Sequence, residues 1–147
     1  MILKSADALE AWGASLAAQL RVGDILALSG ELGAGKTTLA RGILRGLGLI
    51  GEVPSPSFTI VQTYDPPDVT HSVWHVDLYR LDGEEDVIEL GIEEAIDSAI
   101  LIVEWPERMG RRLPDRALTI RLDGAGETER RLTVMRPPDW EGRCLPS

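Results

Sequence analysis

The sequence predicts a single α/β domain, in which helices flank a mixed sheet with parallel inner strands and antiparallel edge strands. Two short runs, Ile25 to Ser29 and Ala99 to Glu104, are apolar almost throughout, as is typical of strands buried on both faces of a sheet. Such runs alternate with segments of helical periodicity, and near the C-terminus two segments alternate apolar with polar residues across a turn. These observations indicate parallel strands joined by helices, with a hairpin at one edge.

The N-terminal third is predicted to place two helices around the first buried strand. Ser5 can cap a helix over about Ala6 to Leu20. The apolar residues that share one face of this helix are Leu9, Trp12, Leu16 and Leu20. After a turn at residues 21–24 and the strand, a second helix is expected over Thr37 to Leu47.

The middle of the chain is predicted to contribute two further strands. A loop rich in Gly, Pro and Ser covers residues 48–57. Strands are expected at residues 58–64 and 72–79, because both segments are rich in β-branched and aromatic residues and an Asp-Pro-Pro break at 65–67 separates them.

The C-terminal half is predicted to continue with an acidic helix, a strand and a hairpin. Residues 83–97 should be helical with a break near Gly91. The buried strand that ends at Glu104 is followed by a short helix that starts within residues 106–109. Residues 117–122 and 130–136 then form an antiparallel hairpin.

We divide the chain into a domain of residues 1–136 and a C-terminal tail of residues 137–147. A length of 147 residues suits one domain with its own core, and no internal repeat or low-complexity linker indicates a second. The tail is expected to be extended and anchored by Trp140.

Composition excludes several classes of function. With 24 acidic and 15 basic residues the formal charge is −9, so most of the surface should repel a phosphate backbone, and nucleic acid is not expected as a direct ligand. The single cysteine, Cys144, excludes an internal disulfide and a multi-cysteine zinc site. No apolar run is long enough to cross a bilayer and no signal core precedes the domain, so we expect a cytoplasmic protein without membrane contact.

One glycine-rich stretch fits the phosphate-binding pattern G-x-x-x-x-G-K-[ST]. Its fixed positions lie between a predicted strand and a predicted helix, and they are Gly30, Gly35, Lys36 and Thr37. Small residues let backbone N–H groups turn toward phosphate oxygens, and the helix N-terminus adds a partial positive charge. Lys36 is one of two lysines in a chain with thirteen arginines, and its compact ammonium suits contact with β- and γ-phosphates. The alternative, a glycine-rich turn before an ordinary helix, is disfavoured by this context.

Two acids near strand ends are candidates for the chemistry of a bound triphosphate. Glu104 ends an apolar strand, and Asp77 lies near the end of a less uniformly apolar one. For either one the alternative is a solvated carboxylate. His75 is expected to be a packed histidine rather than a base, and His71 a surface residue. No His or Cys pattern has metal-ligand spacing, so the expected metal is Mg²⁺ held by oxygen atoms, with Thr37 offering its hydroxyl.

The nucleotide base is indicated only weakly. Guanine-specific switches use an Asn-Lys-x-Asp segment, whereas this chain has no asparagine. This absence favours ATP.

Four segments, in this order and at these separations, resemble the TsaE (YjeE) family of bacterial ATPases. They are GELGAGKTTLARGILRGLG, VPSPSFTIVQTY, HVDLYRL and IVEWP, and the likeness spans about Ser5 to Pro106. The family is needed to make threonylcarbamoyladenosine in tRNA. The resemblance implies a small α/β ATPase, monomeric by itself and slow alone, that uses ATP and Mg²⁺ and acts with TsaB and TsaD. TsaD carries the transfer chemistry, so tRNA would be met only through the complex.

The resemblance also implies roles for individual residues. Lys36, Asp77 and Glu104 would be catalytic: Lys36 binds phosphate, and Asp77 acts through the metal or the attacking water. Thr37 and Glu104 would hold the metal. The nucleotide-binding set would be Glu31, Gly33, Ala34, Gly35, Lys36, Thr37, Thr38, Ser57 and Trp105.

Some positions depart from the family pattern. Ser57, in the switch-like segment 55–59, replaces a more frequent threonine and keeps a hydroxyl. Leu9 and Trp12 replace a common threonine and leucine near the nucleotide base, so the resemblance assigns no residues to the adenine pocket.

Two other functions remain as alternatives. A small-molecule kinase would share the phosphate loop, with a clamp for the acceptor phosphate formed by Arg108, Arg111, Arg112 and Arg116. A nucleotide-gated binding module would use its ATP state to select a partner with negligible turnover. The acidic segment 84–97 could meet a basic partner surface or could be an ordinary solvated face.

Overall fold

A computed structural model describes residues 1–54, 60–124 and 128–146 of the chain. Within them seven strands form one sheet in the order β1-β7-β6-β2-β5-β4-β3. The strands are β1 (Ile2–Leu3), β2 (Ile25–Gly30), β3 (Val61–Tyr64), β4 (Val73–Asp77), β5 (Ile100–Glu104), β6 (Leu118–Gly124) and β7 (Arg130–Met135). The helices are α1 (Ala6–Ala17), α2 (Lys36–Gly46), α3 (Glu84–Glu89), α4 (Ile92–Ala95) and the 3₁₀ helices η1 (Pro106–Arg112) and η2 (Pro138–Trp140).

The sheet has the mixed character that the sequence predicts. The inner pairs β2–β5, β2–β6 and β4–β5 are parallel. The pairs toward the edges, β1–β7, β6–β7 and β3–β4, are antiparallel. The α/β fold class is therefore confirmed, including the C-terminal hairpin.

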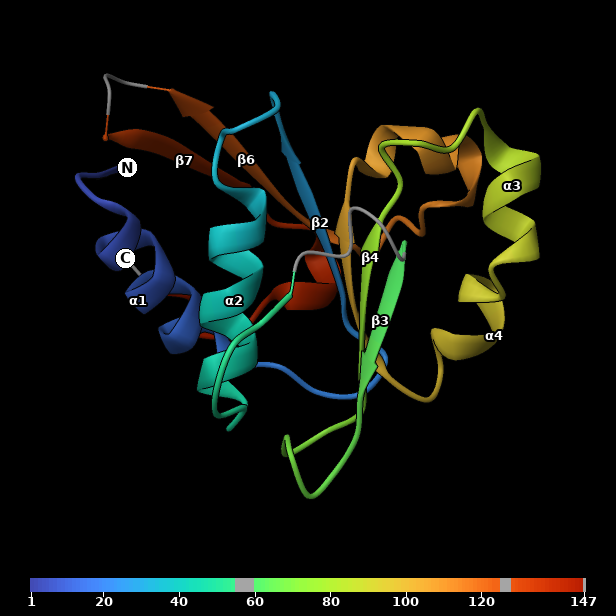
Figure 1. Ribbon diagram of the computed structural model, residues 1–147, viewed down its shortest axis with the longest axis horizontal. Coiled ribbons are helices and arrows are strands. Elements are labelled where there is room, and N and C mark those ends of the chain that lie inside the picture. Colours follow the sequence, from blue (N-terminus) through green and yellow to red (C-terminus); the bar gives the residue numbers. More distant parts are fainter. Residues whose placement is uncertain (55–59, 125–127, 147) are drawn as a thin grey trace.

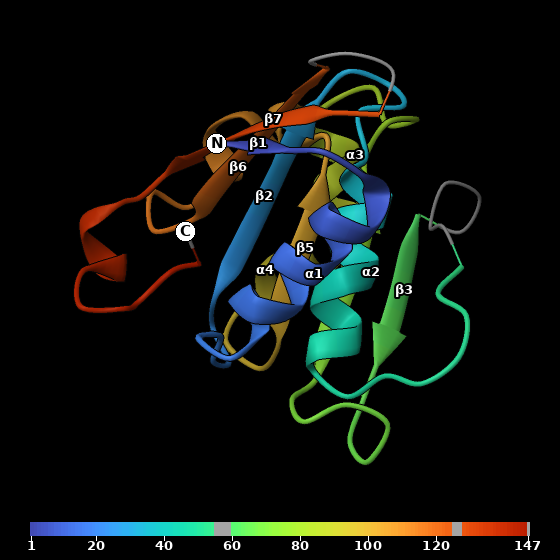
Figure 2. The ribbon, with the colours of Figure 1, turned by 90° about the vertical axis from the view of Figure 1, so that its left-hand side faces the viewer.

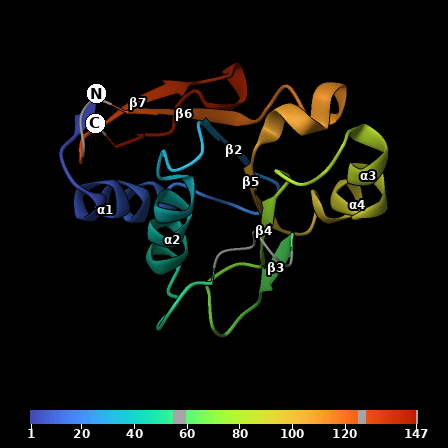
Figure 3. The ribbon, with the colours of Figure 1, turned by 45° about the horizontal axis from the view of Figure 1, so that its top comes forward.

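Helices cover both faces of the sheet, as Figure 1 shows and Figure 3 shows from above. Helices α1 and α2 lie together on one face, in front of the sheet in Figure 2. Successive residues of β2 divide between two cores: Leu26 and Leu28 pack toward α1 and α2, whereas Ile25 and Ala27 pack toward α3 and α4. Because both faces are buried, the strand is apolar from Ile25 to Leu28, as expected from its sequence.

The first helix begins as predicted and ends earlier. The Ser5 hydroxyl accepts a hydrogen bond from the Ala8 N–H at 3.0 Å, which caps α1. The helix stops at Ala17 rather than at Leu20, because the next residues tighten into a turn in which the Leu20 N–H donates to the Ala17 carbonyl. Leu20 is still buried in the core.

Other boundaries differ where tertiary pairing overrides the local pattern. Strand β1 was not predicted, because two residues make no periodic signal; it forms by pairing with β7. Strand β3 begins at Val61, since Ile60 has a left-handed φ of 68° that breaks an extended chain, and residues 58 and 59 lie outside the described residues. Strand β4 ends at Asp77, two residues before the predicted end. The predicted helix break at Gly91 is confirmed by its φ of 74°.

The C-terminal segment packs against the domain through one aromatic side chain. Trp140 is 1% exposed, and its indole N–H donates to the Arg116 carbonyl at 3.0 Å. The Arg143 guanidinium stacks on the Trp140 ring at 4.0 Å and pairs with both carboxylate oxygens of Asp24, just before β2. Trp140 is thus the expected anchor, while the division at 136/137 stays a prediction.

In the part of the chain that the structure describes, no helix has the length and apolar character that a membrane span requires.

Replacing Gly42 by Ala should destabilise the protein. A Cβ atom at this position would lie 2.1 Å from the Glu10 carbonyl oxygen of α1, so α1 and α2 would have to separate. We expect the free energy of unfolding, measured in denaturant, to fall by about 1–3 kcal/mol despite the better helix propensity of Ala. Gly83→Ala is the control, because no described heavy atom lies within 4 Å of a Cβ there. Equal losses would contradict the close helix contact.

Candidate functional site

The loop between β2 and α2 needs glycine at two positions, Gly30 and Gly35. Gly35 has a φ of 106°, and a Cβ there would lie 2.8 Å from Leu9 Cδ2. At Gly30 a Cβ would lie 2.5 Å from the Leu122 carbonyl oxygen. The loop can therefore pass close to α1 and β6 only because Gly30 and Gly35 carry no side chain. Its backbone then lies at the surface of the cavity described below.

Lys36, the first residue of α2, is held against its own loop. Its side chain is buried, and Nζ donates to the carbonyls of Gly30 at 2.5 Å and Glu31 at 2.9 Å. The Trp105 ring lies over the ammonium, with its centroid 4.2 Å from Nζ. Burial lowers the pKa of Lys36, and the carboxylates of Glu104 and Asp77 oppose that shift. These contacts position the ammonium next to the loop before any ligand arrives.

The two predicted acids lie side by side on the face toward α2. Parallel pairing of β4 with β5 makes Asp77 and Glu104 register partners at the carboxyl ends of both strands. The Thr37 hydroxyl donates to the Glu104 carboxylate, with oxygen distances of 3.1 and 3.2 Å. Asp77 accepts a hydrogen bond from the Tyr79 N–H at 3.0 Å. Three oxygen-bearing side chains from distant segments thus meet at one end of the sheet.

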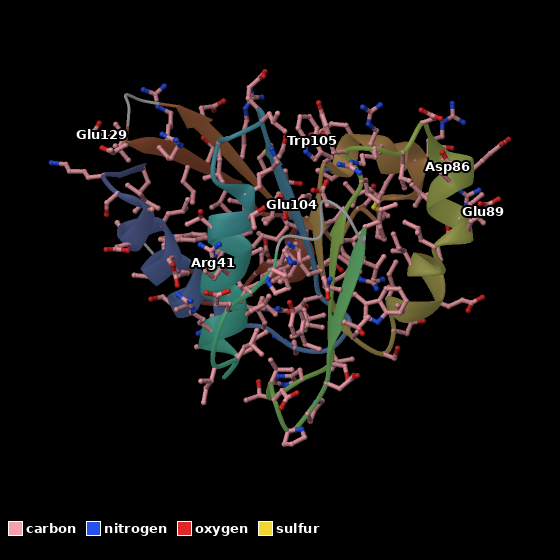
Figure 4. The ribbon with its side chains drawn as sticks, in the orientation of Figure 1. Arg41, Asp86, Glu89, Glu104, Trp105 and Glu129 are labelled. Atoms are coloured by element: carbon pink, nitrogen blue, oxygen red, sulfur yellow. The ribbon has the colours of Figure 1, made fainter. Side chains whose placement is uncertain are left out.

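These residues surround a cavity of about 330 Å³. It is lined by Leu32, Gly33, Gly35, Lys36, Thr37, Thr38, Asp77, Glu104 and Trp105. Figure 4 shows Glu104 and Trp105 between α2 and β4 in this view. A second cavity of about 230 Å³ shares Gly33, Gly35 and Thr38 with the first and extends toward Ser5 and Leu9 of the α1 region.

Most of the described site residues that the sequence predicts gather at the first cavity, and Glu31 and Ala34 do not line it. The Glu31 side chain is exposed, and its carbonyl is the group that contacts Lys36. Ala34 is buried, and its carbonyl accepts a hydrogen bond from Arg130. Ser57 and the whole segment 55–59 lie outside the described residues.

The arginines proposed as an acceptor clamp lie elsewhere. Arg112 pairs with Glu93 at 2.5 Å, and Arg116 lies 3.9 Å from Asp97. None of Arg108, Arg111, Arg112 and Arg116 lines either cavity.

His75 is packed in the core, as predicted, but its contact with Glu104 also makes it part of the site. The ring is fully buried, and Nε2 lies 2.7 Å from a carboxylate oxygen of Glu104. Because an ionised carboxylate only accepts, Nε2 is the donor in this contact. The spacing His75-x-Asp77 on a strand places both side chains on one face, which is the sequence signal that could have revealed this role. Arg130, in the C-terminal hairpin, contacts the loop at the Ala34 carbonyl, and no pattern in the sequence indicated that contact.

Comparison with known proteins identifies the family. A family model described as "Threonylcarbamoyl adenosine biosynthesis protein TsaE" matches residues 3–132. The chain belongs to the TsaE family. This confirms the resemblance found in the sequence.

Individual TsaE proteins align over most of their length. The protein named "tRNA threonylcarbamoyladenosine biosynthesis protein TsaE" from Streptomyces coelicolor is 43% identical over 118 residues, which are 79% of this chain and 80% of that protein. The protein of the same name from Treponema pallidum is 33% identical over 134 residues, covering 90% of this chain and 97% of that protein. The crystal structure of Bacillus subtilis YdiB superposes with a TM-score of 0.77 at 32% identity, covering 91% of this chain and 82% of YdiB.

Replacing His75 by Ala should destabilise the fold. The change removes the buried donor to Glu104 and leaves a void, so the free energy of unfolding at neutral pH should fall by about 2–4 kcal/mol. His71→Ala is the matched control, because His71 is only partly buried and contacts its neighbour Thr70; its loss should stay near 0.5 kcal/mol, roughly the surface value. Denaturant unfolding of both variants measures the difference, and similar losses would show that the Glu104 contact contributes little.

Proposed function

We propose that this TsaE-family chain binds and hydrolyses ATP with Mg²⁺ and serves, together with TsaB and TsaD, in the formation of N6-threonylcarbamoyladenosine in tRNA. The observation that supports this most directly is the meeting of Lys36, Thr37 and Glu104 in one cavity at the carboxyl ends of parallel strands. In open α/β sheets this is the end at which ligands bind.

The first cavity suits a polyphosphate. The N-terminus of α2 faces it with the loop backbone, and oriented N–H groups together with the helix dipole attract anions. Two donors of the Lys36 ammonium are used by loop carbonyls, so the side chain is fixed while its positive charge stays available to a phosphate. In a chain of charge −9 this local positive potential is needed to offset the repulsion of the surrounding acids.

The donor set at the cavity fits magnesium. Thr37 and Glu104 offer a hydroxyl and a carboxylate, and Mg²⁺ prefers oxygen ligands, taking one or two from protein and the rest from phosphates and water. No group of three or more His, Cys, Asp or Glu side chains that could hold a metal occurs among the described residues. When bound, Mg²⁺ supplies charge neutralisation at the phosphate oxygens.

The remaining residues divide the work of the site. The hydrogen bond from His75 Nε2 holds the Glu104 carboxylate in place. Asp77 supplies the second carboxylate that hydrolysis requires. The second cavity, which continues from Gly33 and Gly35 past Leu9, takes the sugar and base. The indole of Trp105 covers Lys36 and limits access of water to its ammonium.

The proposal of a role in tRNA modification rests on the relatives and not on a surface of this chain that could bind nucleic acid. The similar proteins from Streptomyces coelicolor and Treponema pallidum carry the name of a tRNA threonylcarbamoyladenosine biosynthesis protein. The charge of −9 disfavours direct binding to RNA, so contact with tRNA goes through TsaB and TsaD. Hydrolysis by the chain alone is slow and rises in the complex.

Lys36→Ala should weaken ATP binding at least about a hundredfold, because it removes the only lysine charge at the phosphate loop. Titration calorimetry with Mg·ATP measures the dissociation constant. Lys4→Ala removes the chain's other lysine, which is exposed near the N-terminus, and should bind as the wild type does. Wild-type affinity of the Lys36 variant would count against the site.

Phosphate release from ATP, measured for the chain alone and then with TsaB, TsaD and tRNA, tests the function. We expect slow release that rises with the partners. Glu104→Ala should reduce the stimulated rate at least about a hundredfold. Glu107→Ala should have a much smaller effect, because Glu107 bonds Ser29 at 2.7 Å and does not line the first cavity. Equal losses would remove the distinction, and transfer of phosphate to a small metabolite would favour a kinase.

A further inference from the structure

Arg130 reaches from the C-terminal hairpin to the phosphate loop. Its Nε donates to the Ala34 carbonyl at 3.0 Å, and one terminal nitrogen donates to the Gly33 carbonyl at 3.4 Å. The other terminal nitrogen donates to the Glu129 carbonyl at 2.8 Å. One guanidinium therefore bridges two successive peptide groups of a loop that lies almost a hundred residues away, with a sequence separation of 96 from Ala34.

The backbone of Arg130 is fixed in the sheet. It is the first residue of β7, and it is aligned with Gly124 of β6 on one side and with Leu3 of β1 on the other. Figure 4 labels its neighbour Glu129 at this end of the hairpin, on the side of α1. A strand held by two neighbours is a firm support from which a planar guanidinium can fix the loop.

The two hydrogen bonds from Arg130 to the Gly33 and Ala34 carbonyls constrain the direction of the N–H groups in the loop. In a trans peptide the C=O and the following N–H point in opposite directions, so holding the Gly33 and Ala34 carbonyls turns the N–H groups of Ala34 and Gly35 away from Arg130. The Ala34 N–H donates to the Glu31 carbonyl at 3.0 Å and closes the loop. The Gly35 N–H has no hydrogen-bond acceptor among the described residues, and Gly35 lines both cavities.

Arg130 also forms a wall of the second cavity, together with Thr128, Ser5 and Leu9. We propose that Arg130 is a positioning residue for nucleotide binding, which holds the Gly33 and Ala34 carbonyls so that the phosphate loop keeps its binding conformation. The proposal rests on ATP binding by the first cavity. Its ligand class is a nucleoside triphosphate whose phosphates meet the loop and whose sugar and base lie along the Arg130 wall.

The test compares Arg130→Gln and Arg130→Lys with Arg131→Gln in the full chain. Arg131 is the matched control, because it is exposed, follows Arg130 in β7 with its side chain on the opposite face, and lines neither cavity. Arg130→Gln should weaken Mg·ATP binding in calorimetry about tenfold, whereas Arg131→Gln should stay within about twofold of wild type. Arg130→Lys should be intermediate, since an ammonium keeps the charge but cannot hold two carbonyls in a planar fork.

A second measurement separates positioning from charge and from general stability. Hydrogen exchange of the ligand-free variants, read by mass spectrometry on peptides covering residues 28–42, should be faster in Arg130→Gln than in wild type or Arg131→Gln, with melting temperature as the check of folding. Arg130→Lys answers the question where Arg130→Gln does not fold. Wild-type affinity in Arg130→Gln, or full affinity with unchanged loop exchange in Arg130→Lys, would overturn the proposal.

Failure of the proposed function gives a different result. If wild type itself does not bind ATP, the functional proposal fails, while faster loop exchange in Arg130→Gln still shows that Arg130 holds the loop.

Discussion

Glu104 reaches Thr37 across 67 residues of sequence because β2, β4 and β5 run parallel and end together. The same register puts Asp77 beside Glu104, and the two-residue period of β4 turns His75 to the same face. A slip of one residue in this pairing would turn the acid away from α2 and expose apolar side chains to the site. The buried faces of the central strands therefore hold the chemistry in place as well as the fold.

The site stores local strain that the surrounding packing offsets. Trp105 has a left-handed φ of 61°, which costs roughly 1–3 kcal/mol for a residue with a side chain. This turn places its indole over Lys36 and 4.9 Å from the Tyr79 ring. Lys36 is itself buried at the expense of solvation, which lowers its pKa. The acids of α3, such as Asp86 and Glu89, lie to the right of Glu104 and Trp105 in Figure 4.

Much of the fold could be predicted because its signals are local. Apolar runs revealed β2 and β5, the Ser5 cap revealed the start of α1, and Gly91 revealed the break between α3 and α4. The rest depends on partners that are distant in sequence. Strand β1 exists only because β7 lies beside it, and the late start of β3 follows from the left-handed φ of Ile60.

For the site, the family and the candidates Lys36, Thr37, Asp77 and Glu104 could be predicted from the sequence, because each is encoded in a short contiguous pattern. The contacts between these segments became visible only in the folded chain: Thr37 contacts Glu104, His75 is the buried partner of the same carboxylate, and Arg130 donates to the Ala34 carbonyl. These contacts could not be predicted, because strand order and register bring together segments whose local sequences carry no information about one another.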